Sequence, residues 1–398
     1  MSQLALLVCN SAPVAGRILF GTSRPQNPSG PWHSSDRSVA MADGGKMVPI
    51  KVSPTADVYP KRIMEYIEGF LISKTLFTSC ELGVFELLLG SERSLSAAEI
   101  SQAVGASLDG TERLLAACTG MQLLNRHQDD GKVSYSNTEQ ARLFLTRSSP
   151  LSLYQSIHYH SKTIYLCWHY LTDAVREGRT QYEKAFGVSS GDLFEAIYRS
   201  DEEMVKFMQL MHSIWNICGK DVVTAFDLSP FKVICDLGGC SGALAKHCTS
   251  AYPECTVTIF DLPKVVHMSK EHFIKEDDQR ISFHEGDFFK DSLPEAELYI
   301  LARILHDWTD ERCVELLQRI YKACKPGGAV LVVEALLSED GSGPLTAQLY
   351  SLNMLVQTEG RERTDVQYAA LLTAAGFTNI RHCLTGKIYD AVLGHKKA

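Results

Sequence analysis

"CDLGGCSGALAKHC", residues 235–248, is the stretch that decides the fold class of this chain. It begins as an apolar strand, breaks into glycines and resumes as an alanine-rich helix. Four more apolar segments alternate with helical stretches after it: "TVTIFDL", "ISFHEGDFF", "ELYILARIL" and "AVLVVEALL". This alternation predicts an α/β fold with a doubly wound, mostly parallel, Rossmann-like sheet covered on both faces. A final pair, "TNIRHCLTG" and "YDAVLGH", is close enough in sequence to form a hairpin, so we expect at least one antiparallel edge strand.

The glycine turn of this stretch also indicates what kind of ligand the sheet binds, because such sheets bind ligands at the carboxyl ends of their strands. A dinucleotide fingerprint, G-x-G-x-x-G, is excluded, since Cys240 and Ala243 follow Gly238 at the second and third glycine positions. A P-loop is excluded because no Gly-Lys-Ser/Thr follows. The remaining pattern, D-x-G-x-C-x-G from Asp236 to Gly242, favours a nucleoside that carries a cation, such as a sulfonium, over one that carries phosphates.

Two further carboxylates follow the next strands. Asp261 ends the second strand, at the separation where an acidic residue binds ribose hydroxyls in doubly wound folds. Asp287 ends the third, where it can accept a hydrogen bond from an exocyclic amine while Phe288 covers an adenine face. A single Asp at a strand end is more often a helix cap or turn former. Three at successive strand ends favour a nucleoside site.

A candidate general base, His306, ends the fourth strand in "ARILHDWTDE". A core histidine explains this residue equally well when it is taken alone, and its place among the strand-end carboxylates favours catalysis. Glu334 in "VVEALL" and Glu362 in "GRERT" lie where a carboxylate can fix the imidazole tautomer. An imidazole with an ordinary pKa near 6.5 is a suitable base at neutral pH.

The N-terminal half has a different layout. Apolar helices over residues 59–89 carry too many large side chains for one buried stripe, so they need a partner to cover them. A helix with a Ser96/Glu99 capping box, a second helix and a hairpin around Asp130-Gly131 then give the layout of a winged helix. Winged helices often bind DNA through the second helix, but here that helix offers only Arg113. We therefore expect a packing and dimerisation module.

Composition and charge narrow the function classes further. The net charge of -8 gives no overall attraction to nucleic acid, and no run of 18 apolar residues predicts a membrane span. The 12 cysteines show neither a C-x-x-C pair nor zinc-finger spacing, so we expect no metal and a reducing, cytoplasmic location. Residues 1–52 are predicted to be a disordered or alternatively started leader, with a mitochondrial transit peptide as the alternative. The winged helix is predicted over 53–155 and the catalytic domain over 156–398, with a helical pocket segment at 156–230.

Six stretches taken together resemble the hydroxyindole O-methyltransferases, a family of S-adenosylmethionine-dependent winged-helix enzymes. They are "DLGGCSGALAKHC", "IFDLPKVV", "GDFFKD", "ILARILHDWTDE", "CKPGGAVLVVEALL" and "LYSLNMLVQTEGRERT". The similarity extends from about Tyr59 to the C-terminus. It implies methyl transfer from S-adenosylmethionine, without a metal, to the hydroxyl of a small aromatic acceptor by a homodimer, and N-acetylserotonin is the expected acceptor. An enzyme for another small phenol and a catalytically silent paralogue are the alternatives.

The resemblance also assigns site residues. His306 becomes the general base, held by Glu334 and Glu362. The cofactor-binding residues are Asp236, Gly238, Asp261, Gly286, Asp287, Phe288 and Arg303. The acceptor-binding residues are Tyr198, Phe207, Met211, Trp215, Asp307, Asn353 and Gln357.

Two points about these assignments depend on this sequence itself. Phe207, Met211 and Trp215 form a helical stripe that spacing alone assigns to the core, whereas the resemblance places it in the pocket. Asn353 and Gln357, four apart on an apolar helix, can bond an amide of the acceptor.

The chain departs from the family at Cys240, where the family usually has glycine. If the φ angle of Cys240 is positive, its side chain strains the backbone, and we expect cofactor binding to be weakened at most.

Overall fold

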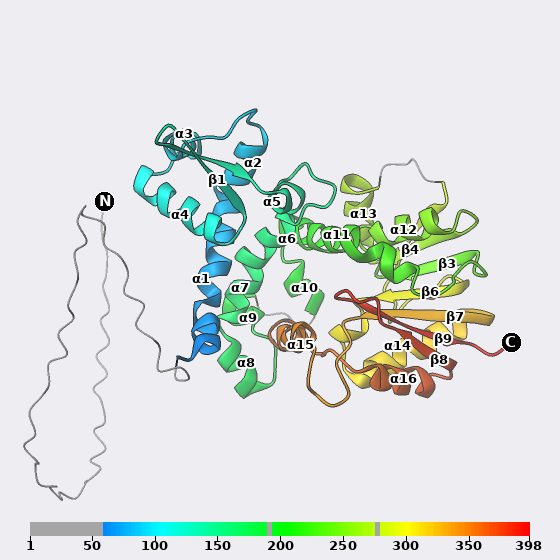
Figure 1. Cartoon of the computed structure of the whole chain (residues 1–398). Coiled ribbons are helices and arrows are strands. Elements are labelled where there is room, and N and C mark those ends of the chain that lie inside the picture. The colour runs from blue at the N-terminus through cyan, green and yellow to red at the C-terminus, as the bar shows by residue number, and fades with distance from the viewer. Residues whose placement is uncertain (1–58, 189–192, 275–278) are drawn as a thin grey trace, which may run out of the picture. The chain divides into compact units, whose positions relative to one another are not determined.

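The computed structural model describes residues 59–188, 193–274 and 279–398 (Figure 1). The expected leader, residues 1–52, lies outside this part of the chain. Residues Lys61–Ala398 pack as one unit. Among the helices of the described residues, none has the length and apolar character that a membrane-spanning segment requires.

The core of the C-terminal region is a seven-stranded sheet of order β5-β4-β3-β6-β7-β9-β8. Its strands are β3 (Val233–Leu237), β4 (Thr256–Asp261), β5 (Ile281–Glu285), β6 (Ala296–Ala302), β7 (Cys324–Glu334), β8 (Thr378–Cys383) and β9 (Asp390–His395). The first five pair in parallel and include the four segments predicted after the glycine turn. The predicted doubly wound, mostly parallel sheet is therefore confirmed.

The predicted C-terminal hairpin is present, since β8 and β9 pair antiparallel. The strand that runs against all the parallel strands, however, is β9, which also pairs antiparallel with β7 and lies inside the sheet. The sequence placed the antiparallel direction at the edge. The crossover from β7 leaves a gap of one strand before β8, and the short return from β8 allows only an antiparallel neighbour, so β9 fills that gap.

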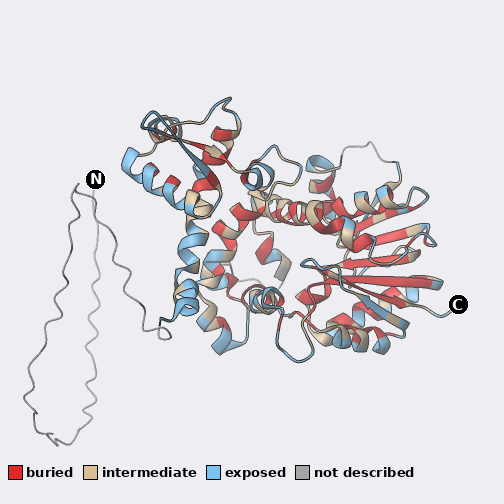
Figure 2. Ribbon diagram, in the orientation of Figure 1, coloured by how far each residue is buried: buried red, intermediate tan, exposed pale blue. Residues whose placement is uncertain are grey.

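Helices cover both faces of this sheet (Figure 1). On one side lie α11 (Asp201–Val223), α12 (Ala243–Ala251) and α13 (Pro263–His272), and on the other lie α14 (Asp310–Ala323) and α16 (Asp365–Ala374). Alternate strand residues supply the two cores: Ile234 packs with Leu244 on the first face, and Cys235 packs with Leu316 on the second. Both faces of the central strands are buried (Figure 2), which explains why these segments are apolar throughout rather than alternating.

The N-terminal region has the predicted order of helix, helix and hairpin. The elements are α3 (Ala97–Val104), α4 (Leu108–Gly120), β1 (Leu124–Asp129) and β2 (Lys132–Asn137), with α5 (Glu139–Phe144) after them. The capping box forms, since the Ser96 side chain accepts from the Glu99 N–H while the Glu99 side chain accepts from the Ser96 N–H. Asp130 and Gly131, with φ of 47° and 79°, make the tight turn between the two strands.

Helix α1 (Lys61–Glu81), which α2 (Val84–Leu89) follows, is exposed along most of its length (Figure 2). Only Ser79 and Cys80 of α1 are buried. Four apolar side chains of α1 are each more than half exposed: Ile67, Phe70, Leu71 and Ile72. An exposed apolar surface of this kind marks an interaction site.

The segment between the two regions is helical, as predicted. It contains α6 (Tyr154–Tyr159), a π-helical turn η1 (His160–Ile164), α7 (Tyr165–Trp168), α8 (Leu171–Glu177), α9 (Tyr182–Phe186) and α10 (Leu193–Ile197). The remaining helices are the 3-10 turn η2 (Leu305–Asp307) and α15 (Leu345–Gln357). The predicted boundary at residue 155 falls inside α6, and the domain boundaries remain predictions.

Candidate active site

The glycine turn after β3 passes through the left-handed backbone region three times. The φ angles of Gly238, Cys240 and Gly242 are 70°, 51° and 72°. A Cβ on Gly238 would lie 2.5 Å from Ile304 Cδ1, so a side chain is excluded there by both conformation and space. Cys240 carries its side chain in a conformation that costs a residue with a Cβ roughly 1–2 kcal/mol. The φ angle of Cys240 is positive, so the condition under which we expect its side chain to weaken cofactor binding is met.

The Asp261 carboxylate braces this turn from the end of β4. Its Oδ2 accepts the Cys240 N–H at 2.9 Å and its Oδ1 accepts the Leu262 N–H at 2.8 Å. Burial raises the pKa of Asp261 to about 6, against the lowering effect of these two hydrogen bonds. The carboxylate is thus fixed in place and ionised at neutral pH, with lone pairs left for a ligand.

Asp236 lies beneath the turn and not on an open surface. It is buried, and a Cβ on Gly239 would lie 2.7 Å from its Oδ2. Burial, together with the charge of Asp261, raises its pKa to about 7. Its Oδ2 has no hydrogen-bond partner within the described residues. Asp236 therefore lies against the glycine turn and does not line the cavity in front of it.

A cavity of about 370 Å³ lies in front of the turn, at the carboxyl ends of the parallel strands. All predicted cofactor residues except Asp236 line it: Gly238, Asp261, Gly286, Asp287, Phe288 and Arg303. So do five of the predicted acceptor residues: Tyr198, Phe207, Met211, Trp215 and Asp307. The aromatic rings of Phe194, Phe289 and Trp308 complete its walls, and the sequence analysis did not assign these three residues to the site.

Two polar residues of this cavity are already engaged with the protein. Asp287 accepts the Phe289 N–H at 2.9 Å and lies 2.9 Å from Lys290 Nζ. The guanidinium of Arg303 lies over the Tyr389 ring at 5.4 Å, with Nη1 3.2 Å from Met211 Sδ. Arg303 has a φ of 59°, which is rare for a residue with a long side chain and typical of strained functional sites.

His306 lies on η2, buried between three carboxylates. Its Nδ1 is 2.9 Å from Glu362 Oε1 and 3.2 Å from Glu334 Oε2, and its Nε2 is 3.6 Å from Asp307 Oδ1. Burial acts to lower the pKa of His306, but the carboxylates outweigh it and raise the pKa to about 9. The expected ordinary pKa near 6.5 is therefore wrong, because the sequence could not show how many charges surround the ring.

The backbone of η2 is held from both sides. Glu334 Oε1 accepts the N–H groups of Ile304, Leu305 and His306 at 3.1, 3.0 and 3.3 Å. Arg363, only 1% exposed, donates to the carbonyls of Leu305 and Trp308 at 2.9 and 2.8 Å. These contacts hold the backbone that carries the imidazole, and the sequence analysis did not assign Arg363 to the site.

A smaller cavity of about 70 Å³ adjoins the first and holds His306. Five residues line both cavities: Phe194, Phe207, Met211, Arg303 and Asp307. The other residues that line the smaller cavity include Asn353 and Gln357 of α15, His160 of η1 and Tyr159 of α6. The structure thus brings His306 together with both predicted amides, whereas Tyr198 and Trp215 lie on the larger cavity only.

His306, Glu334 and Glu362 also have the composition of a metal site, and one ligand atom from each lies within 4.8 Å of the others. However, one oxygen of Glu334 already accepts three backbone N–H groups, and Glu362 bonds the imidazole. The predicted function of these carboxylates, to orient the ring, accounts for this geometry.

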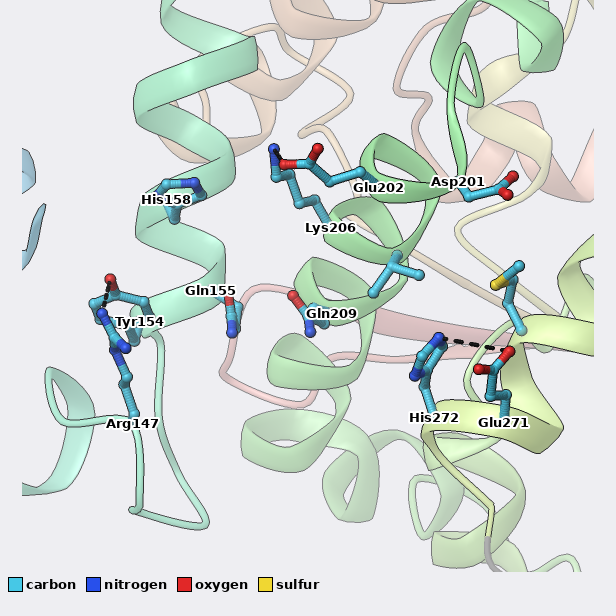
Figure 3. Close-up of a pocket in the computed structure, with 12 residues that line it drawn as sticks. Arg147, Tyr154, Gln155, His158, Asp201, Glu202, Lys206, Gln209, Glu271 and His272 are labelled. Atoms are coloured by element: carbon cyan, nitrogen blue, oxygen red, sulfur yellow. Dashed lines mark hydrogen bonds and ion pairs between the residues drawn. The ribbon is translucent and has the colours of Figure 1, made fainter.

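A further hollow lies elsewhere on the surface. An open groove of about 710 Å³ lies between α6, α11 and α13 and is lined by charged and polar side chains (Figure 3). Lys206 is paired with Glu202 at 2.6 Å, and Arg147 donates to the Tyr154 hydroxyl at 2.7 Å. None of the predicted site residues lines this groove, so its size does not make it the catalytic centre.

Comparisons with known proteins agree with the class that the fold and the two cavities define. The model of the O-methyltransferase dimerisation domain matches residues 64–147, and that of the O-methyltransferase domain matches residues 168–378. The chain therefore belongs to the S-adenosylmethionine-dependent O-methyltransferase family, as the sequence predicted.

Individual relatives are similar over nearly their whole length. Acetylserotonin O-methyltransferase of Gallus gallus is 62% identical over 338 residues, which cover 85% of this chain and 98% of that protein. The Homo sapiens protein of that name is 53% identical over 332 residues, which cover 83% and 96%. The crystal structure of human N-acetylserotonin methyltransferase in complex with SAM matches with a TM-score of 0.84 and 51% identity, covering 87% of this chain and 100% of that one.

Proposed function

We propose that this protein transfers a methyl group from S-adenosylmethionine to the hydroxyl of N-acetylserotonin, giving melatonin. The observation that carries the proposal is the pair of adjoining cavities: one has the features of a nucleoside site, and the other places His306 beside two amides. The names of the relatives at 62% and 53% identity support this choice of acceptor.

The larger cavity fits S-adenosylmethionine. Gly238 leaves open the space that a Cβ would fill, and the ionised Asp261 can accept from ribose hydroxyls. Asp287 and Phe288 would hold the adenine. Gly286 leaves room for the Phe260 ring, because a Cβ on residue 286 would lie 2.5 Å from Phe260 Cζ. The bound cofactor supplies an electrophilic methyl group on a sulfonium.

His306 would accept the proton of the acceptor hydroxyl at Nε2 as the methyl group is transferred. Its Nδ1–H stays on Glu362, which fixes the tautomer that leaves Nε2 free to accept. A phenol-like hydroxyl has a pKa near 10, so it is largely protonated at neutral pH and gains from a base. Because the pKa of His306 is raised to about 9, the basic form is the minor one at neutral pH and increases as the pH rises.

Alignment of the two substrates contributes more than proton removal. A well-oriented pair of reactants gains roughly 7–11 kcal/mol, whereas a positioned base contributes about 10²–10⁴-fold. Phe207 and Met211, which line both cavities, supply walls that both substrates contact. Asp307, Asn353 and Gln357 would hold the polar groups of the acceptor.

The direct test is mass-spectrometric detection of methylated product from the purified full chain, S-adenosylmethionine and a panel of N-acetylserotonin, serotonin and simple phenols. Product from N-acetylserotonin that falls by about 10²–10⁴-fold in His306→Ala supports the reaction and the base together. Equal rates in the two proteins would rule out the base. Product from a simple phenol alone would favour the other-phenol alternative, and failure to bind S-adenosylmethionine would favour the silent paralogue.

We also propose that the protein is a homodimer through α1. The support is the exposed apolar face of α1 and the match to a dimerisation domain that contains it. Light scattering on the wild type is expected to give twice the chain mass. Phe70→Glu should shift the protein to monomer, whereas Leu384→Glu, at another exposed apolar position, should not. A monomeric wild type would refute the proposal.

A cytoplasmic location is the remaining proposal. Every cysteine in the described part of the chain is a free thiol, which fits a reducing compartment. Imaging of the full chain with a C-terminal fluorescent fusion tests it, and mitochondrial signal would favour the transit-peptide alternative.

A further inference from the structure

The Asn353 amide in the smaller cavity is held in one orientation by Trp168. The indole Nε1–H of Trp168, on α7, donates to Asn353 Oδ1 at 2.8 Å. An indole N–H can only donate, so the atom of Asn353 that faces it is the oxygen. The Nδ2 group of Asn353, which has no hydrogen-bond partner within the described ranges, is therefore the end left for a ligand.

The second amide, Gln357, is oriented in the same sense. The hydroxyl of Tyr182, on α9, donates to Gln357 Oε1 at 3.3 Å, while Gln357 Nε2 lies 3.5 Å from the Asn353 carbonyl. A backbone carbonyl can only accept, so both contacts require the same orientation of the amide. These distances are long, and Gln357 is held less firmly than Asn353.

The consequence is a cavity end that offers N–H donors. Both amides line the smaller cavity, four residues apart on one face of α15. A carbonyl oxygen can accept from such donors. A protonated primary amine has N–H donors and no acceptor, so it would leave the amide N–H groups unpaired.

Formal charge alone does not set the preference for an acyl group. Arg303, His306 and Asp307 all line the smaller cavity, so an ammonium group would meet the carboxylate of Asp307 as well as the cations of Arg303 and of protonated His306. The orientation of the amides is the feature that distinguishes an acyl group from a free amine.

We propose that Trp168 is a positioning residue that sets acceptor specificity: by holding the Asn353 oxygen it selects aromatic hydroxyl compounds that carry an acyl carbonyl over those that carry a free amine. This inference rests on the proposed function, because it requires the acceptor hydroxyl at His306 and the acceptor substituent at α15.

The test compares kcat/KM for N-acetylserotonin and for serotonin in the wild type and Trp168→Phe. The phenylalanine keeps an aromatic ring and removes the indole N–H. The freed amide can then rotate and present its oxygen, so the preference for N-acetylserotonin is expected to fall about tenfold, the effect of one hydrogen bond. Tyr165→Phe, on the same helix with an exposed side chain, is the matched control and should keep the wild-type ratio.

A second variant guards against a folding defect in Trp168→Phe. Asn353→Asp replaces the N–H donors with an oxygen while Trp168 keeps its partner, and it should move the ratio further in the same direction. Dissociation constants of both compounds, measured by calorimetry on the full chain with S-adenosylhomocysteine present, give a readout that needs no methyl transfer. If Trp168→Phe lowers kcat/KM equally for both compounds, the tryptophan only packs and the proposal is overturned.

The two proposals fail separately. Methylation of N-acetylserotonin with a ratio that Trp168→Phe leaves unchanged refutes this inference and keeps the function. Absence of any methylation refutes the function. If N-acetylserotonin still binds more tightly than serotonin in that case, and Trp168→Phe removes the difference, the role of Trp168 is supported.

Discussion

The two adjoining cavities differ in what forms their walls. The larger one has a backbone-built wall after β3, where Gly238 and Cys240 pass through the left-handed region, and aromatic side chains such as Phe288 form the rest. The smaller one is lined mainly by helical side chains that are far apart in sequence, such as Tyr159 and Asn353. A backbone-built wall should fail when a side chain is added, and a side-chain-built wall should change its selectivity when one is altered.

Gly238→Ala is expected to have the largest effect, about thirtyfold weaker binding of S-adenosylmethionine. The added Cβ would lie 2.5 Å from Ile304 Cδ1 at a φ of 70°, and strain of about 2 kcal/mol in the wall of the site corresponds to that loss. Calorimetric titration measures it. Gly105→Ala is the matched control, since its φ is 66° with no atom within 4 Å of the added Cβ. Equal cofactor affinity in Gly238→Ala and the wild type would break the comparison.

Glu362→Gln should shift the pH dependence of kcat/KM. The carboxylates raise the pKa of His306 to about 9, so the basic form and the rate increase as the pH rises toward 9 in the wild type. Removing the negative charge 2.9 Å from Nδ1 lowers this pKa, and the rising limb should move down by at least about one pH unit, a tenfold effect. Glu339→Gln, at an exposed position, serves as control. An unmoved limb would mean that His306 is not the group that titrates.

Gln357→Ala tests the side-chain-built wall. The loss of one amide partner should raise KM for N-acetylserotonin about fivefold and leave the affinity for S-adenosylmethionine unchanged. Steady-state kinetics with N-acetylserotonin and with a simple phenol that lacks an amide separate this effect from a packing defect. A matching rise in KM for the phenol would contradict the amide contact.

Cys240→Gly should have the smallest effect, about threefold tighter binding of S-adenosylmethionine. Glycine adopts a φ of 51° without the cost of about 1 kcal/mol that a Cβ carries, so the turn can take the shape that the cofactor requires with less strain. Cys240→Ala keeps the strain and removes the sulfur, so it separates the two causes. Weaker binding in the glycine variant would show that the side chain supports the cavity.

The same contrast explains what the sequence could predict. The sheet and its ligand edge were predictable because apolar strands, the glycine turn and Asp261 are local signals, and the structure places all the predicted cofactor residues but Asp236 on one cavity. The interior place of β9 was not predictable, since it depends on which edge remains open after β8 is laid down.

The smaller cavity was predicted only in part. His306 was found because it ends an apolar strand near other strand-end carboxylates, whereas Asn353 and Gln357 were assigned by the resemblance. Glu362 and Glu334 do lie within 3.2 Å of the imidazole. Trp168 and Tyr182 could not be found, because their partners are 185 and 175 positions away. The raised pKa of His306 likewise depends on burial and on charges that only the folded chain brings together.

The interior position of β9 has a consequence for how the protein is made. β9 is the last strand along the sequence, yet it lies between β7 and β8. A ribosome releases β8 first, so β7 and β8 each carry an unpaired edge until β9 emerges. The His306 N–H, on the turn after β6, donates to Glu334 Oε1 at the end of β7. The nascent chain therefore passes through an interval in which the edges of β7 and β8 are both open to association with other chains.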